Sequence, residues 1–257
     1  LWVGLEEAKN IIKSFNKRPS IDLRINSLKT DLNQFLKELQ NHNIEAKKIN
    51  ELKYGISLTS NPRSIKNLPG YKDGKWVVQD RSSQWVGALL DPKSGEKILD
   101  ACAAPGSKTT HIAELSNDEA EILAIDRSEK RLNILKSNIE RLNIKGVDTL
   151  KADACNLISL KPELIAYFDK ILIDAPCSGI GTLGRNPDLR WSLNKKKIEE
   201  LIIIQERLLE NLLPLLKKSG TLVYSTCTIC PEENNLLIKR FLSKNNELKL
   251  KSEKQIL

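Results

Sequence analysis

Apolar and polar positions follow two different patterns along the chain, and the change falls near residue 75. Before it, the pattern predicts a short helix, an alternating strand from Ile21 to Ile25, and a second helix for which Asp31 suits the N-cap. The apolar positions 32, 35, 36 and 39 of that helix fall on one face. Residues 1–75 therefore predict a small α+β domain, which ends in a loop rich in Asn-Pro, Pro-Gly and Asp-Gly pairs.

From residue 76 to residue 257, short apolar strands alternate with helical segments. The expected strands are 97–100, 121–126, 148–151, 170–174 and 221–225, and the expected helices begin near Ser107 or span 129–142 and 198–217. This alternation predicts an α/β fold with a parallel, doubly wound sheet. Ligands of such sheets bind beyond the carboxyl ends of the strands, so chemical groups are expected just after each strand.

Composition favours a folded protein outside the membrane. Hydrophobic residues make up 40% and charged residues 29% of the 257 residues, and no apolar run approaches the roughly 18 residues that span a bilayer. The start of the chain lacks the pattern of a secretory signal, so we expect a cytoplasmic protein with no membrane partner.

The net charge of +8 is concentrated in the first 75 residues, which hold 14 Lys and Arg against 8 Asp and Glu. A basic surface of this kind favours a polyanion such as nucleic acid, although a solubilising Lys-rich surface explains the charge nearly as well.

The segment after the first expected strand, DACAAPGSK at residues 100–108, is a turn of small side chains that lets a ligand approach the backbone. It is neither a dinucleotide loop nor a Walker loop, and by itself it is also typical of an ordinary tight turn. Asp126 favours a nucleoside cofactor, because it lies 20 residues beyond Gly106 and its carboxylate could accept hydrogen bonds from both ribose hydroxyls. Asp153 follows the third strand and suits either an adenine contact or a helix cap.

Two cysteines follow the last two expected strands. The fourth strand leads to Asp174 and Cys177, and the fifth leads to Cys227. Thiolates are natural nucleophiles toward an electron-poor ring, and this edge of the sheet would bring them beside a cofactor.

Three other interpretations of the five cysteines remain open. Cys227 and Cys230 form a C-x-x-C pair, but the context of a thioredoxin-like redox motif is missing. No metal is expected, because a second C-x-x-C is lacking and the only histidines, His42 and His111, have no ligand-like spacing. A buried apolar role suits Cys155 and, less clearly, Cys102 and Cys230.

Four features together, namely DACAAPGSKTT, Asp126, IDAPCSG and YSTCTI-x-PEEN, resemble the Sun/Fmu (RsmB-type) RNA cytosine-5 methyltransferases, which methylate 16S ribosomal RNA in bacteria. The resemblance runs from about Arg24 through Glu233. It implies a Rossmann-like, S-adenosylmethionine-dependent methyltransferase domain at 76–257, preceded by a small RNA-binding domain at 1–75.

The resemblance also implies the roles of individual residues. Cys227 would be the nucleophile, Cys177 would assist product release, and Asp174 would lie between the cofactor and the target base. The loop would line the methionine and ribose, Asp126 would hold the ribose hydroxyls, and Asp153 would meet the adenine. The implied cofactor-binding set is Cys102, Ala103, Ala104, Pro105, Gly106, Ser107, Lys108, Asp126, Arg131, Asp153 and Asp174.

Cytosine chemistry gives a reason for two thiols. Addition of a thiolate to C6 makes C5 nucleophilic enough to accept a methyl group, and a second thiol could serve as base or relay when the C5 proton and the cysteine leave. The base must leave its stack, which favours a single-stranded or loop cytosine. Spacing alone does not decide which cysteine attacks, because DNA cytosine methyltransferases use the cysteine of a Pro-Cys motif.

Candidate RNA-binding residues lie in two segments. Arg185, Arg190 and Trp191 suit phosphate contact and base stacking, although Trp191 could instead pack on the body of the protein. The resemblance adds the R-I-N-x-x-K segment, with Arg24, Asn26 and Lys29.

Members of the resembling family commonly begin with a helical NusB-like domain and end in a further strand near a DGFF-like segment. This chain has no methionine, begins at Leu1-Trp2 and stops at Gln255-Ile256-Leu257, so we expect a piece of a longer product, truncated at both ends. A monomer is expected. Rival functions are a non-catalytic RNA-binding ribosome-assembly factor, a methyltransferase acting on a small molecule or protein, and a nicotinamide dehydrogenase.

Overall fold

The computed structural model describes residues 3–60, 62 and 64–251. The strands are β1 (Ile21–Ile25), β2 (Ala46–Lys48), β3 (Gly55–Leu58), β4 (Trp76–Val78), β5 (Lys97–Asp100), β6 (Glu121–Asp126), β7 (Val147–Lys151), β8 (Phe168–Asp174) and β9 (Leu216–Ser225). The α-helices are α1 (Leu5–Phe15), α2 (Leu32–Asn41), α3 (Arg81–Leu90), α4 (Ser107–Leu115), α5 (Glu129–Leu142), α6 (Leu157–Leu160), α7 (Leu189–Ser192), α8 (Lys195–Leu212) and α9 (Asn235–Lys244).

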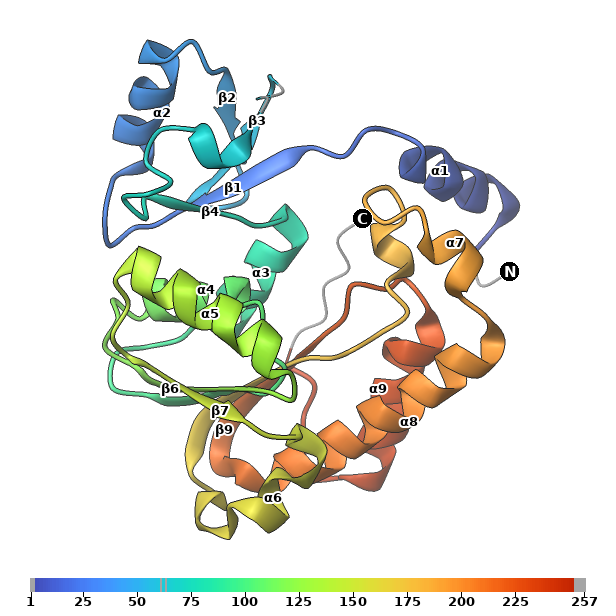
Figure 1. Cartoon of the computed structure of the whole chain (residues 1–257). Coiled ribbons are helices and arrows are strands. Elements are labelled where there is room, and N and C mark those ends of the chain that lie inside the picture. The colour runs from blue at the N-terminus through green and yellow to red at the C-terminus, as the bar shows by residue number, and fades with distance from the viewer. Residues whose placement is uncertain (1–2, 61, 63, 252–257) are drawn as a thin grey trace.

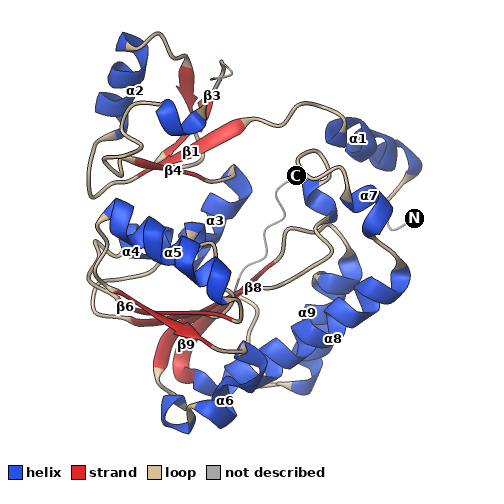
Figure 2. Ribbon diagram, viewed as in Figure 1, coloured by secondary structure: helices blue, strands red, loops and turns tan. Residues whose placement is uncertain are grey.

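The described strands form an antiparallel sheet in the order β2-β3-β1-β4 and a parallel sheet in the order β7-β6-β5-β8-β9. Figures 1 and 2 show the antiparallel sheet above the parallel one, with α3, α4 and α5 between them. The predicted combination of a small α+β unit and a parallel α/β unit is confirmed.

The first unit folds around one apolar core. Asp31 caps α2 by accepting from the backbone N–H groups of Asn33 and Gln34, as the sequence predicted. Phe35 and Leu39 on the inner face of this helix are fully buried against β1, β3 and the Trp76 ring. The short strands β2 and β3 were not predicted.

The boundary between the units falls at β4. This strand pairs with β1, with Ile25 opposite Trp76, so it belongs to the antiparallel sheet. The sequence placed the boundary after residue 75, one residue before β4 begins. We propose a boundary after Val78 instead, because a cut at 75 would remove an edge strand from the first sheet.

Alternating side chains cover both faces of the parallel sheet. Leu99, Ile171 and Ile173 face α8 and α9, whereas Ile98 and Leu172 face α3, α4 and α5. All five side chains are fully buried. Two covered faces explain why these strands are continuous apolar runs, as expected of a parallel sheet.

The predicted segments of this unit match the structure closely, with one error. The strand 121–126 and the helix 129–142 agree with β6 and α5 residue for residue. The helix predicted to run to Lys217 instead ends at Leu212, because Pro214 lacks the amide that an α-helix interior requires. Residues from Leu216 onward join β9.

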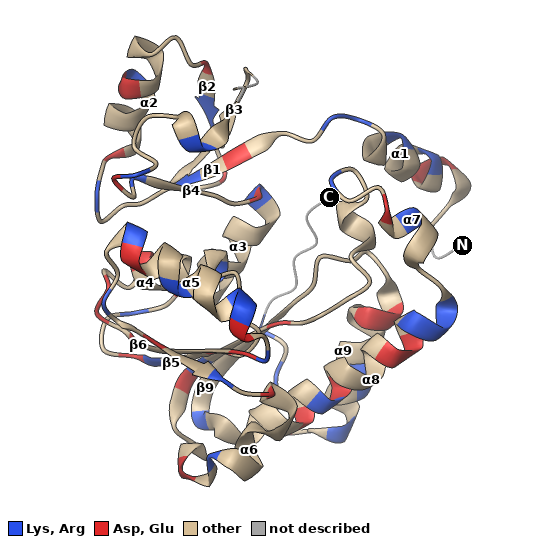
Figure 3. Ribbon diagram, in the orientation of Figure 1, with Lys and Arg blue, Asp and Glu red and all other residues tan. Residues whose placement is uncertain are grey.

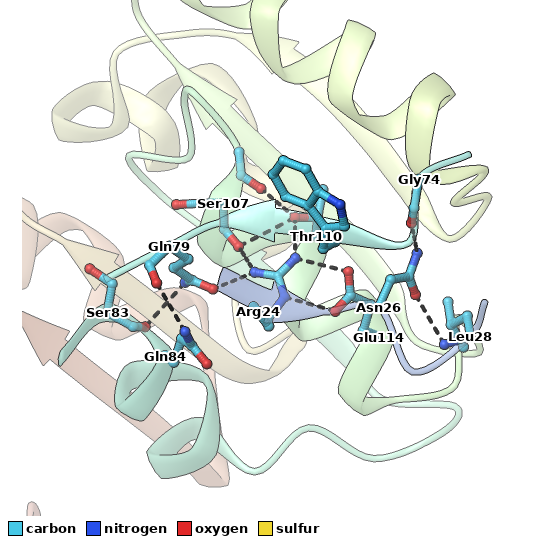
Figure 4. A network of polar contacts seen from close by, with 12 residues as sticks. Arg24, Asn26, Leu28, Gly74, Gln79, Ser83, Gln84, Ser107, Thr110 and Glu114 are labelled. Carbon is cyan, nitrogen blue, oxygen red and sulfur yellow. Dashed lines mark hydrogen bonds and ion pairs between the residues drawn. The ribbon is translucent and has the colours of Figure 1, made fainter. Parts of the chain in front are cut away.

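Arg24 joins the two units through a buried network (Figure 4). Its Nε and Nη2 atoms donate to the two carboxylate oxygens of Glu114 in α4, at 2.7 and 2.8 Å. Its Nη1 atom donates to the carbonyl oxygen of Ser107 at 2.6 Å and also to Gln79. The guanidinium therefore links β1 to both the first and the last turn of α4.

This burial corrects the prediction that Arg24 and Asn26 bind RNA. Both side chains are 0% exposed, and Asn26 is occupied by the Gly74 carbonyl oxygen and the Leu28 amide. Lys29, the third residue of that set, is exposed. Among the described helices, none is long and apolar enough to cross a membrane.

Candidate active site

Chemical groups gather at the carboxyl ends of the parallel strands. The turn 101–106 follows β5, Asp126 ends β6, Asp174 ends β8, and Cys227 lies two residues beyond β9. Register pairs Asp174 with Ser225 across β8 and β9, which brings the two cysteine loops side by side. The structure thus places the sequence-predicted groups at one edge of the sheet.

The turn after β5 is held open by Gly106. Its φ of +102° lies in the left-handed region, and a Cβ there would meet the Leu135 side chain at 2.9 Å. Ala103 and Ala104 are buried, whereas Ser107 and Lys108 are partly exposed at the start of α4. No side chain caps the start of α4, and the first amides of an α-helix have no partner within the helix.

Asp126 holds that turn in place. Its carboxylate accepts from the Ala104 amide at 3.2 Å and from the Ser128 amide at 2.9 Å. Arg131 lies 3.4 Å from the same carboxylate and also contacts the Ala104 carbonyl oxygen. The two predicted cofactor residues Asp126 and Arg131 thus meet at the turn.

Asp153 is exposed and accepts from the Cys155 amide at 3.0 Å, capping a short 3-10 helix. The capping role that the sequence left open is therefore present in the structure. A contact of Asp153 with adenine stays a prediction.

Asp174 is the charged centre of the edge. Lys108 donates to one of its oxygens at 2.6 Å, and the Ser225 hydroxyl donates to the other at 2.8 Å. The Lys108 side chain is 14% exposed and the Asp174 side chain 31%, so water reaches this ion pair mainly from the side of Asp174. Ser225 of β9 and Lys108 of α4 therefore fix the carboxylate at the end of β8.

Cys177 and Cys227 lie in contact. Their Sγ atoms are 3.3 Å apart, and the Cys227 amide donates to Cys177 Sγ at the same distance. Donation from the Cys177 thiol lowers the pKa of Cys227, and nearby Lys108 acts in the same direction. The pKa of Cys177 is raised by its contact with Cys227 and by burial. Cys227, which is the more exposed of the two, is therefore the sulfur that ionises first.

A pocket of about 490 Å³ opens over the two sulfurs. A volume in this range suits a small organic ligand. The pocket is lined by the two cysteine loops and by the segment that leads into α7: Cys177, Ser178, Gly179, Thr182, Arg185, Asn186, Pro187, Asp188, Leu189, Ser192 and Cys227.

The other three cysteines are unsuited to nucleophilic chemistry. The pKa values of all three thiols are raised, mainly by burial. The pKa of Cys155 is raised to about 11 and that of Cys230 to about 12. All five cysteines are free thiols. In the described ranges, no group of three or more His, Cys, Asp or Glu could hold a metal ion.

The predicted RNA-binding residues beside the pocket differ in exposure. Trp191 is 89% exposed, so it does not pack on the body of the protein. Arg185 pairs with Asp80, and Arg190 donates to the Asn16 side chain at 2.8 Å. Figure 3 shows further Lys and Arg at the start of α8 and between α1 and β1.

Sequence reasoning missed a buried polar network beneath the cysteine loops. Gln205 in α8 donates to Glu233 at 3.0 Å, and Glu233 accepts from Ser178. One signal was available, because Gln205 shares the buried helical spacing of Leu208, Leu209 and Leu212. A polar residue on an apolar face needs a buried partner.

The chain matches two family models. Residues 87–256 match the model described as "16S rRNA methyltransferase RsmB/F", and residues 3–65 match the model described as "Methyltr_RsmF/B-like, ferredoxin-like domain".

Among curated proteins, the chain is 43% identical to "Probable ribosomal RNA small subunit methyltransferase B" from Synechocystis sp., over 95% of this chain and 54% of that protein. It is 39% identical to "Ribosomal RNA small subunit methyltransferase B" from Photorhabdus laumondii, over 95% of this chain and 56% of that protein. The chain therefore spans about half the length of these relatives.

Two solved structures from Pyrococcus horikoshii are also similar. A methyltransferase homologue matches with a TM-score of 0.82 and 35% identity, over 93% of this chain and 74% of that chain. NSun6 with SFG matches with a TM-score of 0.85 and 25% identity, over 94% of this chain and 84% of that chain.

Proposed function

The chain belongs to the RsmB/F family of 16S rRNA methyltransferases, and from that premise we propose that it methylates C5 of a cytosine in small-subunit (16S) ribosomal RNA. The methyl donor is S-adenosylmethionine. The observation that carries the proposal is the pair of thiols 3.3 Å apart under an open pocket.

S-adenosylmethionine fits the first turn of the parallel sheet. Gly106 has no Cβ, and the side chains before it in the turn are small. A ligand can therefore approach the backbone of this turn closely. The related NSun6 structure holds SFG, an analogue of S-adenosylmethionine. Residues 102–108, Asp126, Arg131 and Asp153 would hold the cofactor, which supplies an electrophilic methyl group when bound.

Cys227 is assigned as the nucleophile because its pKa is lowered and it is exposed. Its thiolate adds to C6 of the cytosine, and the electron pair that moves to C5 allows that carbon to accept the methyl group. Water that enters the open pocket takes the C5 proton, and the electron pair of the C5–H bond restores the C5–C6 double bond. The C6–sulfur bond then breaks, and Cys227 departs as a thiolate.

Cys177 and Asp174 serve the later steps. Cys177 stays protonated where Cys227 is ionised, so it can relay a proton during release of the product. Asp174 and Lys108 lie between the cofactor turn and the two cysteine loops, where they can orient the base. The target cytosine must leave its stack to reach both sulfurs, which favours a single-stranded or loop site.

Release of tritium tests this function directly. The protein is incubated with S-adenosylmethionine and a small-subunit rRNA transcript that carries tritium at C5 of its cytidines. We expect tritium to appear in water only when the cofactor is present, and Cys227→Ala to abolish the release. Methyl incorporation without tritium release would overturn C5 as the target, and RNA binding with no transfer would favour the assembly-factor alternative.

A further inference from the structure

Two adjacent residues beneath the active site, Glu233 and Asn234, each bind one of the two cysteine loops. Neither is needed for the chemistry described above, and both belong to the segment between β9 and α9. Glu233 is 0% exposed, although it carries a carboxylate. A buried carboxylate is stable only when donors satisfy its oxygens, so its partners show what it does.

Glu233 holds the loop of Cys177. Its Oε1 atom accepts from the Ser178 amide at 2.9 Å, and its Oε2 atom accepts from the Ser178 hydroxyl at 2.5 Å. Gln205 donates both to Glu233 Oε1 at 3.0 Å and to the Pro176 carbonyl oxygen at 2.9 Å. Of the residues on either side of Cys177, Ser178 is therefore fixed to the carboxylate directly and Pro176 through Gln205.

Asn234 holds the loop of Cys227 in the same way. Its Oδ1 atom accepts from the Thr226 hydroxyl at 2.6 Å, and its Nδ2 atom donates to the Thr228 carbonyl oxygen at 3.0 Å. These two threonines flank Cys227. The Thr228 hydroxyl also lies 2.7 Å from the Ser178 hydroxyl, which ties the two halves together.

We propose that Glu233 and Asn234 are positioning residues that set the separation of the two active-site sulfurs, Glu233 through Cys177 and Asn234 through Cys227. The catalytic meaning of this role rests on the proposed two-cysteine function. Because the residues are consecutive, the backbone between them gives both loops a common reference. A misplacement of 1 Å at a reacting group can cost about 100-fold in rate, so a fixed spacing has catalytic value.

The donors to Glu233 are neutral, and this predicts which substitution preserves the role. No Lys or Arg of the described residues forms an ion pair with this carboxylate. Glutamine can keep an oxygen facing the Ser178 amide and Gln205, while its amide donates to the Ser178 hydroxyl. Glu233→Gln should therefore keep the spacing, whereas Glu233→Ala should lose it.

Capture of a trivalent arsenical reports the spacing without any RNA or cofactor. Phenylarsine oxide forms two arsenic–sulfur bonds with a close pair of thiols and releases one water, with no change in oxidation state. We expect the wild-type protein to capture it, and peptide mass mapping to place the bridge on Cys177 and Cys227. Cys177→Ser and Cys227→Ser should each abolish this bridge.

The variants then test the two positioning residues. We expect Glu233→Ala and Asn234→Ala to weaken capture by about tenfold or more, and Glu233→Gln to stay within about twofold of the wild type. Glu232→Ala is the matched control, because this neighbouring carboxylate is exposed and accepts from the Cys230 thiol rather than from either active-site loop segment that Glu233 and Asn234 bind. This variant should capture the arsenical normally. Thermal melting checks that each variant is folded, and if Glu233→Ala unfolds, Asn234→Ala carries the same test.

Several results would overturn the proposal. They are absence of the bridge in the wild type, wild-type capture by the folded alanine variants, or loss of capture in folded Glu233→Gln. Capture that depends on Glu233 and Asn234 in a protein that methylates no RNA would leave the positioning role intact and refute the proposed function instead.

Discussion

The Sγ atoms of Cys177 and Cys227 lie 3.3 Å apart although the two residues are 50 positions apart in the chain. Parallel pairing of β8 with β9 produces this contact, because both loops leave the same edge of the sheet. The contact makes the two thiols unequal, with a lowered pKa at Cys227 and a raised pKa at Cys177.

This inequality predicts how Cys227 reacts with an alkylating agent. Cys177→Ala removes the thiol that donates to Cys227, so the pKa of Cys227 rises and its alkylation at neutral pH slows. Cys177→Ser is the matched control, because its hydroxyl can still donate. Iodoacetamide labelling across a pH series, read peptide by peptide, measures the midpoint. An unchanged midpoint in Cys177→Ala would refute this origin of the shift.

Arg24 should matter for stability rather than for RNA affinity. Arg24→Met leaves the buried Glu114 without its cation, and breaking a buried pair in this way costs about 3–5 kcal/mol. Urea unfolding measures the loss. Lys9→Met, which breaks an exposed pair with Glu6, should leave the unfolding midpoint unchanged. Equal midpoints for the two variants would contradict the structural role of Arg24.

Asp100 gives a predicted dependence of stability on pH. Burial raises the pKa of this carboxyl to about 7 in the folded protein, from an ordinary value of 3.8. The folded state thus binds the Asp100 proton more tightly than the unfolded state does. The resulting contribution to the free energy of unfolding is fully present below pH 3.8 and is lost as the pH rises to about 7. By linkage the loss is at most about 4 kcal/mol.

Asp100→Asn should remove that decline in the free energy of unfolding between pH 4 and pH 7. Asp169→Asn is the control, because the pKa of Asp169 is lowered by Lys217 and its own titration falls below this range. Urea unfolding at several pH values measures the free energy of unfolding of both variants and of the wild type. A decline that persists in Asp100→Asn would show that another group causes it.

Trp191 should contribute to RNA affinity through stacking. A base on an aromatic ring contributes about 1–3 kcal/mol, so Trp191→Ala should weaken binding of a single-stranded RNA by about 5- to 150-fold. Trp191→Phe should recover part of the affinity. Ile203→Ala removes another exposed apolar side chain, from α8, and should bind as the wild type does. Filter binding at one fixed salt concentration measures all four proteins.

The sequence predicted the parallel sheet because its signals are local. Apolar runs such as Ile171–Ile173 and the capped helix after Ser128 depend on neighbours in the chain, so β8 and α5 could be located. The position of the candidate site followed from the same sheet, since the carboxyl ends of parallel strands share one edge.

Predictions from the sequence were wrong or incomplete where a residue far away in the chain determines whether a side chain is buried. The sequence shows that Arg24 is basic but does not show its partner. Glu114 lies 90 positions away and forms the ion pair that allows Arg24 to be buried. Glu233 and Gln205 were likewise missed, because nothing local shows that they meet beneath the cysteine loops. Very short strands such as β2 carry too few residues for a period to be visible.

A denaturing gel shows which of the two cysteines attacks the base. Wild type, Cys177→Ala and Cys227→Ala are incubated with S-adenosylmethionine and a small-subunit rRNA transcript, and covalent protein–RNA adducts are resolved from free protein. We expect Cys177→Ala to accumulate an adduct, because release is blocked after Cys227 has attacked, and Cys227→Ala to form none. An adduct in Cys227→Ala with none in Cys177→Ala would refute these roles and make Cys177 the nucleophile.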